Sequence, residues 1–193
     1  MKSDSNITIK EVINSDELKK FVMFPHTLYK DSKYWVAPII KEELEVLNKE
    51  TNPVFNNAIA HYFLAYIDGE IVGRIAALIN WIEVKDLQKK KVRFGWFDFI
   101  DDQNVSKALL EKVIEIGKKN NLEFIEGPVG FSNMDKAGML IKGFEKKNTM
   151  ITMYNYSYYQ DHMKAHGYSK LAEWVEYELK IANYDDSPEK IKK

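Results

Sequence analysis

The sequence contains no cysteine. Disulfides, thiolate metal sites and cysteine nucleophiles are therefore excluded, and the chain suits a reducing, cytoplasmic compartment. A surplus of one charge is also missing, because 28 basic and 29 acidic residues leave a formal net charge of −1. Without a basic surplus there is no long-range field to attract nucleic acid or an anionic membrane surface. The partner we expect is a small or neutral molecule.

Long apolar runs are missing as well. The N-terminal residues are polar and charged, and they lack the apolar region of a secretory signal. The longest apolar run, Ile71 to Ile82, is interrupted by Arg74 and Asn80. It is shorter than the ~20 residues that a membrane-spanning helix needs. The sequence therefore predicts neither export nor a membrane span.

The first part of the chain predicts one strand and two short helices. Residues 7–13 alternate apolar and polar side chains, as a half-buried strand does. Asn14 and Glu17 then have the spacing of a helix capping box. Pro25 is expected to kink or end this first helix, and Pro38 is suited to open a second one.

The rest of the chain predicts a hairpin followed by alternating helices and strands. Asp68-Gly69 separates two apolar runs and favours a tight hairpin turn. The predicted elements are hairpin strands 60–67 and 71–80, a charged connection 83–91, an aromatic strand 92–100, a helix 102–119, a strand 122–127, a helix 155–166 and a strand 168–181. At 45% hydrophobic residues, the 193-residue chain predicts one domain, 1–181, with a charged tail or linker start at 182–193.

This order of elements resembles the GNAT superfamily of acyl-CoA-dependent N-acyltransferases over most of residues 6–181. Shorter phrases are similar to a bacterial GNAT-like branch: Trp35-Val36, Asn52-Pro53-Val54-Phe55, Gly73-Arg74-Ile75-Ala76-Ala77, Asp101-Asp102, Gly127-Pro128 and Tyr154-Asn155. The resemblance implies an α+β fold with a mixed, mostly antiparallel sheet of about six to seven strands, flanked by helices and splayed between the fourth and fifth strands. Members of this branch often continue further, so a C-terminal continuation or a homo-oligomer is expected.

In the GNAT family a Q/R-x-x-G-x-G/A loop after the fourth strand holds the CoA pyrophosphate on a helix N-terminus. The corresponding residues here are 101–106, where the first position is acidic and both glycine positions are replaced. The resemblance implies these cofactor-binding residues: Phe99, Ile100, Asp101, Asp102, Gln103, Asn104 and Ser106. It implies acetyl-CoA or a longer acyl-CoA as co-substrate, or pantetheine bound to an acyl carrier protein, and no metal.

Two interpretations of this degenerate pyrophosphate loop remain open. Asp101 or Asp102 can cap the following helix internally, which places a carboxylate where it repels pyrophosphate. Alternatively, the loop still admits a phosphate, because Asn104 tolerates the left-handed conformation and Ser106 is small.

Asp98 is the candidate general base, because the family often uses an acidic residue of the fourth strand to deprotonate the amine. Burial between Phe97 and Phe99 would raise its pKa towards neutrality. Strand alternation leaves open that Asp98 points to solvent instead.

The family's usual acid, a tyrosine before Gly167, corresponds to Met163 here. Tyr158 and Tyr159 are then the candidates to protonate the leaving thiolate. The alternative is that these two residues, with Tyr154 and Tyr156, build an aromatic wall anchored by their hydroxyls.

Loops after the fifth strand line the acceptor site in this family, which points to residues 127–138. The predicted substrate-binding residues are Arg74, Asn80, Ser132, Asn133, Asp135, Tyr154 and Asn155. Side-chain bonding within an Asx-type turn is the alternative for the loop residues. Arg74 needs a partner if it is buried, either Asp98 or a substrate carboxylate.

Histidines do not suggest a metal site. His162 and His166 lie four residues apart on a predicted helix, but no third ligand stands at a recognised spacing. His26 and His61 are isolated and are interpreted as ordinary structural or surface residues.

Two functions remain open from the sequence. The first is an acyltransferase that moves an acyl group to a small-molecule amine by direct attack. The second is a non-catalytic GNAT-fold ligand-binding or interaction module that has lost efficient CoA binding.

Overall fold

The computed structural model describes residues 6–132, 134–149 and 152–177. Its centre is a mixed sheet of five strands in the order β1-β2-β3-β4-β5. The strands are β1 (Thr8–Glu11), β2 (Ala58–Ile67), β3 (Glu70–Asn80), β4 (Lys91–Phe99) and β5 (Phe124–Glu126). The first four run antiparallel to one another, and β5 runs parallel to β4. The α+β class and the mixed sheet are confirmed, with fewer strands described than the six to seven expected.

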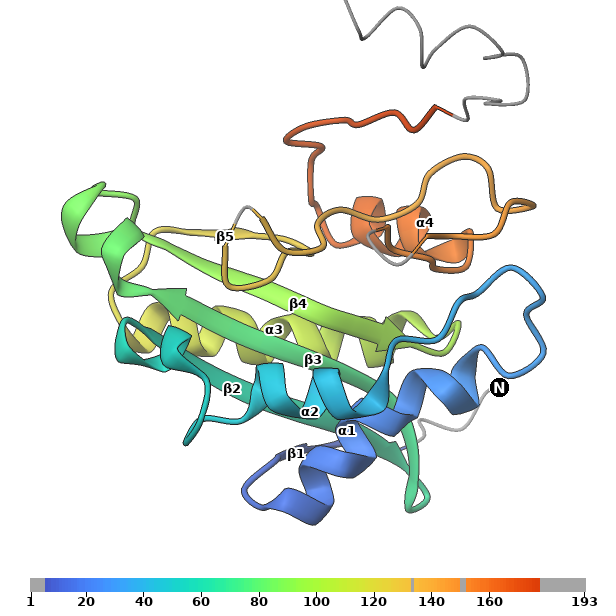
Figure 1. Cartoon of the computed structure of the whole chain (residues 1–193), viewed down its shortest axis with the longest axis horizontal. Coiled ribbons are helices and arrows are strands. Elements are labelled where there is room, and N and C mark those ends of the chain that lie inside the picture. The colour runs from blue at the N-terminus through green and yellow to red at the C-terminus, as the bar shows by residue number, and fades with distance from the viewer. Residues whose placement is uncertain (1–5, 133, 150–151, 178–193) are drawn as a thin grey trace, which may run out of the picture.

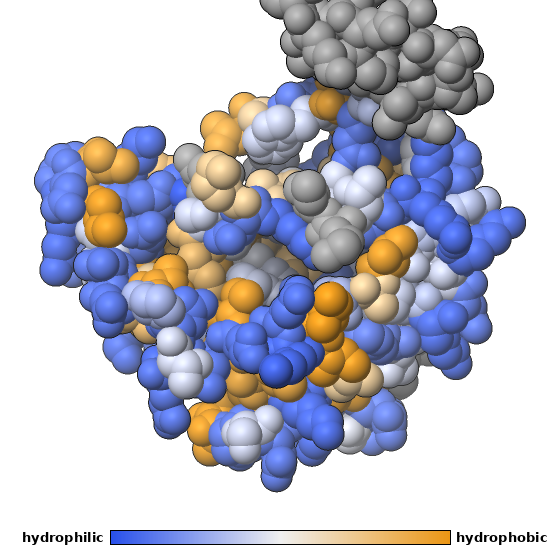
Figure 2. Space-filling model, viewed as in Figure 1, coloured by the Kyte–Doolittle hydropathy of each residue, from blue (hydrophilic) through white to orange (hydrophobic). Residues whose placement is uncertain are grey.

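Helices cover both faces of the sheet (Figure 1). They are α1 (Ser15–Leu28), α2 (Ile40–Leu47), α3 (Gln103–Lys119) and α4 (Tyr158–Ala165), with short helical turns η1 (Pro53–Asn56) and η2 (Ile82–Asp86). Side chains of α1 and α2 join one buried cluster, and those of α3 and α4 join a second cluster across the sheet. None of the helices in the described part of the chain is long and apolar enough to cross a membrane. The face that carries α1 and α2 is a mosaic of hydrophilic and hydrophobic residues (Figure 2).

Local sequence signals account for several boundaries. The Asn14 side chain accepts a hydrogen bond from the Glu17 N–H, and the Glu17 carboxylate accepts one from the Ile13 N–H, as expected for a capping box. Asp68 and Gly69 adopt φ angles of 50° and 87°, which confirms the hairpin. Pro25 does not end α1, because the helix continues to Leu28 and the Pro25 carbonyl accepts from the Tyr29 N–H.

The prediction of a strand at 168–181 is wrong for its described part. Residues 168–177 follow α4 without strand pairing, and residues 178–181 lie outside the described ranges. Four large apolar side chains of this segment are 70–83% exposed: Leu171, Trp174, Val175 and Tyr177. Alternating apolar residues form a strand only where an edge is within reach, and the described β5 has three residues.

The sheet opens between β4 and β5. These strands pair only over Lys91–Arg93 with Phe124–Glu126, and the Val129 N–H still reaches the Phe94 carbonyl at 2.8 Å. Beyond this point the edge of β4 faces α4 rather than another strand. The predicted splay between the fourth and fifth strands is therefore present.

Candidate functional site

The site begins at a distortion of β4. Pairing with β3 shifts its register between Arg74 and Ala76, and Trp96 adopts a φ of 45°. A left-handed conformation at a bulky residue costs of order 1–3 kcal/mol and persists only where the surroundings enforce it. At the preceding Gly95, a Cβ would lie 2.6 Å from the Val129 carbonyl oxygen. The bulge and the loop after β5 therefore fit together through a residue without a side chain.

Asp98 lies just beyond the bulge and is buried at 7% exposure. Arg74 Nε donates to Asp98 Oδ2 at 2.7 Å, which confirms the predicted ion pair, and the Tyr29 hydroxyl donates to Oδ1 at 2.8 Å. Arg74 also donates to the Phe21 carbonyl at 2.9 Å. Both carboxylate oxygens are thus engaged inside the protein, and the alternative in which Asp98 points to solvent is wrong. Its role as a base stays a prediction.

A directed chain of hydrogen bonds leads from Asp98 to α4. The single hydrogen of Tyr29 goes to Asp98, so the Tyr159 hydroxyl must donate to the Tyr29 oxygen at 2.9 Å. The Tyr159 oxygen in turn accepts from the Phe99 N–H at 3.2 Å. Every donor in this chain has an acceptor, and it connects α1, β4 and α4.

The tyrosines of this hydrogen-bond chain, Tyr29 and Tyr159, stay protonated near neutral pH, and so does the neighbouring Tyr158. Burial, and then the Asp98 carboxylate, raise the pKa of Tyr29 well above its ordinary value of 10.0. Burial and Asp98 raise the pKa of Tyr159 in the same direction, and its hydrogen bonds with Tyr29 and the Phe99 backbone oppose this in part. For Tyr158, burial and then Asp101 raise the pKa. A phenol with a raised pKa donates its proton less readily, which is unfavourable for the predicted acid role.

The first turn of α3 is capped by the chain itself. The Asp102 side chain accepts from the Asn104 N–H at 2.8 Å, and its carbonyl accepts from the Val105 and Ser106 N–H groups. Asp102 has an extended backbone, as N-cap residues do. The interpretation that one of the two aspartates caps this helix is confirmed. Asn104 belongs to the helix and does not adopt the left-handed conformation considered for it.

Ser106 connects α3 to α4. Its hydroxyl, fully buried, lies 2.8 Å from His162 Nδ1 and 2.8 Å from His166 Nε2, and His162 Nε2 lies 3.0 Å from Asp101 Oδ1. The Asp101 carboxylate takes the Nε2 hydrogen of neutral His162, so His162 Nδ1 accepts from Ser106 and His166 donates to it. The two histidines predicted to be four apart on one helix thus share a serine.

The aromatic wall is present. Rings of Tyr154, Tyr156, Tyr158 and Tyr159 contact one another in sequence, with centroids 5.1–6.2 Å apart. The Tyr159 ring stacks on Phe99 at 4.2 Å. Tyr158 donates its hydroxyl hydrogen to the Phe99 carbonyl, and Tyr156 donates to the Leu28 carbonyl. The hydroxyls anchor this wall to β4 and α1, as the structural alternative for these tyrosines expects.

Several solved acetyltransferase structures share this architecture. No family model matches the chain. The chain superimposes on an aminoglycoside acetyltransferase from an uncultured soil metagenomic sample, solved with sisomicin, with a TM-score of 0.54 and 14% identity over 90% of this chain and 97% of that one. A predicted acetyltransferase from Clostridium acetobutylicum, solved with acetyl-CoA, gives 0.54 and 13% over 90% and 97%. AAC(6')-Iy, solved with a CoA bisubstrate analogue, gives 0.53 and 14% over 91% and 99%.

The chain has the GNAT fold. Among curated proteins, this GNAT-fold chain is 31% identical over 172 residues to protein YghO of Escherichia coli, which covers 87% of the chain and 44% of YghO. It is 26% identical over 188 residues to the bacterial ceramide synthase of Caulobacter vibrioides, which covers 97% of the chain and 48% of that protein. The chain thus spans about half the length of the curated relatives it matches.

The GNAT resemblance places the pantetheine amides of CoA along the end of β4 and its pyrophosphate on the start of α3. Here the N–H and carbonyl of Phe99 already bond to Tyr159 and Tyr158. At α3 the Asn104 N–H is taken by Asp102, and a second carboxylate, Asp101, stands beside it. A phosphate would meet two carboxylates at a helix start where the Asn104 N–H is already engaged. In this arrangement the predicted cofactor-binding residues do not fit CoA.

The predicted acceptor loop bonds mainly to itself. Ser132 N–H donates to Asp135 Oδ2 at 2.7 Å, and the Ser132 hydroxyl accepts from Met134 N–H at 3.1 Å, which is the serine counterpart of an Asx turn. The Asn155 amide is buried and bonds to both backbone groups of Leu140. Asn133 lies outside the described residues. Substrate binding by these residues stays a prediction.

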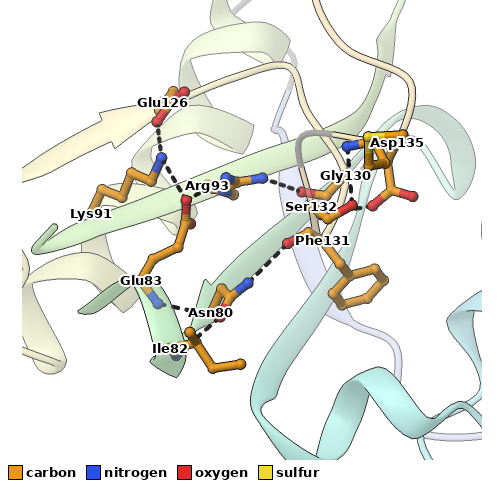
Figure 3. A network of polar contacts seen from close by, with 11 residues as sticks. Asn80, Ile82, Glu83, Lys91, Arg93, Glu126, Gly130, Phe131, Ser132 and Asp135 are labelled. Atoms are coloured by element: carbon orange, nitrogen blue, oxygen red, sulfur yellow. Dashed lines mark hydrogen bonds and ion pairs between the residues drawn. The ribbon is translucent and has the colours of Figure 1, made fainter. Parts of the chain in front are cut away.

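A buried charge network lies beside this loop and is joined to it through Arg93 (Figure 3). Glu83 Oε1 lies 2.6 Å from an Arg93 nitrogen and 3.1 Å from Lys91 Nζ, and Lys91 also pairs with Glu126. Arg93 donates to the Gly130 carbonyl at 3.2 Å. Burial by itself would raise the pKa of Glu83, but hydrogen bonds from Arg93 and Lys91 outweigh it and lower this pKa. The charged connection expected at 83–91 thus joins β3 to β4, and it has a buried ion at each end, Glu83 and Lys91.

Asn80 completes the support of this loop. Its side chain donates to the Phe131 carbonyl at 3.3 Å and accepts from the Ile82 N–H at 3.0 Å (Figure 3). The Phe131 ring is buried and packs against Trp96 and Phe55. Asn80 thus holds the loop against the bulge of β4.

Three residues near the bulge were not singled out as site residues from the sequence. Trp96 Nε1 donates to Glu43 Oε2 of α2 at 2.7 Å. His26 of α1 packs edge-on against Trp35 at 5.1 Å, and its buried Nε2 finds no hydrogen-bond partner in the described part of the chain. Burial, and then Arg74, lower the pKa of His26, while Glu43 opposes this. No local motif marks these residues, because they meet only in the folded chain.

Within the described ranges, no three histidine, aspartate or glutamate side chains are arranged to hold a metal ion. A surface cavity of about 350 Å³ borders the end of α4. Its lining residues are Ile114, Ile125, His166, Gly167, Tyr168 and Ser169. None of them is a predicted catalytic or substrate-binding residue.

Proposed function

We propose that this chain is the GNAT-fold unit of an N-acyltransferase, which joins an acyl group to an amine, and that it supplies the acceptor side of the reaction. The observation that supports this most is the opening of the sheet between β4 and β5, next to the strained bulge at Trp96. The same fold occurs in acetyltransferases solved with aminoglycoside or CoA ligands.

The name of one relative supports amide chemistry. A ceramide is an amide of a fatty acid and a long-chain amino alcohol, and the bacterial ceramide synthase matches 97% of this chain. The acceptor class we propose is therefore a primary amine, with small polyamines or aminoglycosides and long-chain amino alcohols as the two forms to compare. The donor is an acyl thioester, either acyl-CoA or pantetheine on a carrier protein.

The acceptor side has groups that suit an amine. Glu43 presents a half-buried carboxylate beside Trp96, and a carboxylate next to an aromatic ring attracts an ammonium group. Direct attack requires the neutral amine, so a base must remove one proton. His26, whose pKa is lowered and whose Nε2 is unpartnered among described residues, is a neutral base on this side. Asp98 is the alternative base, but it must first release Tyr29 or Arg74.

The proposal is tested by titrating the ¹⁵N-labelled chain with a polyamine, an aminoglycoside and a micellar amino alcohol. Saturable shifts of the Trp96 indole N–H, which bonds to Glu43, are expected with at least one class. Glu43→Gln should weaken that binding by about tenfold, the loss of one charge-assisted contact. Glu42→Gln, on the exposed side of the same helix turn, is the matched control and should bind as the parent does.

A transfer assay completes the test. The chain, acceptor and acyl thioesters are incubated together, and the amide product is sought by mass spectrometry. Absence of both amine binding and amide product would refute the proposed function. Amine binding without product from this chain alone agrees with a unit that spans about half of its relatives.

The second candidate is a non-catalytic GNAT-fold ligand-binding or interaction module. The occupied peptide groups of Phe99 favour it. It predicts that a ligand raises the melting temperature in a concentration-dependent way while no donor yields an amide. Amide formation by the chain would exclude it.

A further inference from the structure

Helix α4 is fastened along the whole path that a donor would follow in this fold. At the end of β4, the Phe99 N–H donates to the Tyr159 oxygen at 3.2 Å, and the Phe99 carbonyl accepts from Tyr158. The single N–H of Phe99 is therefore not available to a pantetheine amide, and its carbonyl is already engaged by Tyr158. The rings of Tyr159 and His162 also cover the Phe99 ring, with centroids at 4.2 and 5.1 Å.

The second fastening lies at the first turn of α3. Ser106 is held by His162 and His166, and His162 also bonds to Asp101. Protonation of His162 would not release it, because its Nδ1–H would then donate to Ser106 while the serine hydrogen turns to the Gln103 carbonyl at 3.1 Å. Asp101 and the capping Asp102 keep two carboxylates at the helix start. The attachment is thus satisfied in both charge states of His162.

The third fastening connects α4 to the centre of the sheet. Tyr159 donates to Tyr29, and Tyr29 donates to the buried Asp98–Arg74 pair. Withdrawal of Tyr159 to admit a ligand would leave the Phe99 N–H without its acceptor and the Tyr29 oxygen without its donor in a buried region. The three fastenings act on one helix of eight residues, so α4 cannot leave one position without disturbing the others.

We infer that α4 closes the opening between β4 and β5, so that this chain binds no acyl-CoA there, and that the acyl donor is bound by residues outside this chain. The second part of this inference, the place where the acyl donor binds, rests on the proposed function, since only an acyltransferase needs a donor. In this chain α4 packs into the opening of the GNAT sheet. The specialised groups left to this unit are those of the acceptor side around Trp96 and Glu43.

The test follows the Phe99 and Asn104 amides of the ¹⁵N-labelled chain during titration with acetyl-CoA and octanoyl-CoA, with calorimetry in parallel. Up to about 1 mM ligand, a range that covers the weakest useful affinities, no saturable heat and no shift at these amides is expected. Hydrogen exchange of the Phe99 amide should be slow and unaffected by either ligand.

Tyr159→Phe keeps the ring and removes the acceptor of the Phe99 N–H, together with the hydrogen bond that Tyr159 donates to Tyr29. Exchange at Phe99 should then accelerate by at least about tenfold more than at other β4 amides, without acyl-CoA binding. Tyr66→Phe is the matched control, because the Tyr66 hydroxyl has no hydrogen bond in the described structure. Phe99 exchange that stays the same in Tyr159→Phe would overturn the proposed fastening.

Saturable binding of acyl-CoA with shifts at Phe99 and Asn104 would overturn the inference and leave the proposed function standing. Binding with shifts confined to other residues would keep the opening closed but overturn the placement of the donor outside this chain. Failure of amine binding and of amide formation, with Phe99 still protected, would instead remove the proposed function and leave the closed opening.

Discussion

The hydroxyl of Tyr29 is the best single group with which to test the polar chain beneath the candidate site. Its hydrogen goes to Asp98, and its oxygen accepts from Tyr159, both in a buried environment. Tyr29→Phe removes this hydroxyl and keeps the ring, which packs against Trp35, Tyr154 and Tyr156. The change therefore isolates two hydrogen bonds from the aromatic packing around them.

The expected loss of stability follows from these two bonds. A hydrogen bond to a charged group contributes about 1.5–3 kcal/mol, and a buried donor left without an acceptor costs about 1–3 kcal/mol. Because Arg74 still holds Asp98, the two effects overlap, and we expect a decrease of about 3 kcal/mol in the free energy of unfolding. For a chain of this size, roughly 2–4 °C per kcal/mol gives a drop in melting temperature of about 6–12 °C.

Urea unfolding followed by tryptophan fluorescence measures this difference, and an unchanged m-value shows that the folded state keeps its compactness. Tyr66→Phe, which also removes a tyrosine hydroxyl, should cost less than about 0.5 kcal/mol. A loss below about 1 kcal/mol in Tyr29→Phe would refute the reasoning, because the hydroxyl would then be no better bonded than one at the surface.

Further predictions concern other parts of the chain. Glu83→Gln removes the anion between two buried cations, and urea unfolding should show a loss of about 3–5 kcal/mol in the free energy of unfolding. Glu123→Gln, in an exposed pair, should cost under about 1 kcal/mol. Equal losses in the two variants would contradict the buried network. Asp102→Ala should lower stability by about 0.5–2 kcal/mol through loss of the α3 cap, and protection of the Asn104 amide should fall with it. Because the pKa of Tyr29 is raised in the folded state, its contribution to stability is full below pH 10 and is lost as the pH rises further. The free energy of unfolding measured from pH 8 to 11 should show this loss, and the decrease with pH should be less steep in Tyr29→Phe.

Several parts of the site could be predicted from the sequence. The pairing of Arg74 with Asp98 follows from two ionisable groups placed within apolar strands, each of which needs a partner when buried. The cap of α3 follows from the acidic residues at its start. The aromatic wall follows from four tyrosines within six residues, a density that suits packing.

Other parts could not be predicted. Glu83 and Lys91 belong to a run of charged residues that is typical of a solvated loop. They are buried because the loop at Gly130 covers this end of the sheet, where its carbonyl accepts from Arg93, and this contact cannot be read from the sequence. His26 carries no local signal, since the contacts that single it out come from Trp35 and from Arg74 of a different element. The extended segment 168–177 has the alternation of a strand but no partner among the described residues.

The sequence by itself determined most of the elements and their order, because capping residues, hairpin turns and apolar periodicity act over a few residues. It also determined that both glycines of a phosphate-binding loop are missing. Only the tertiary structure decided what occupies the opening of the sheet. Phe99 meets Tyr158 and Tyr159 across 59 and 60 residues of chain, and Asp98 meets Tyr29 across 69. Such contacts depend on how α1, β4 and α4 pack together, and no local pattern encodes them.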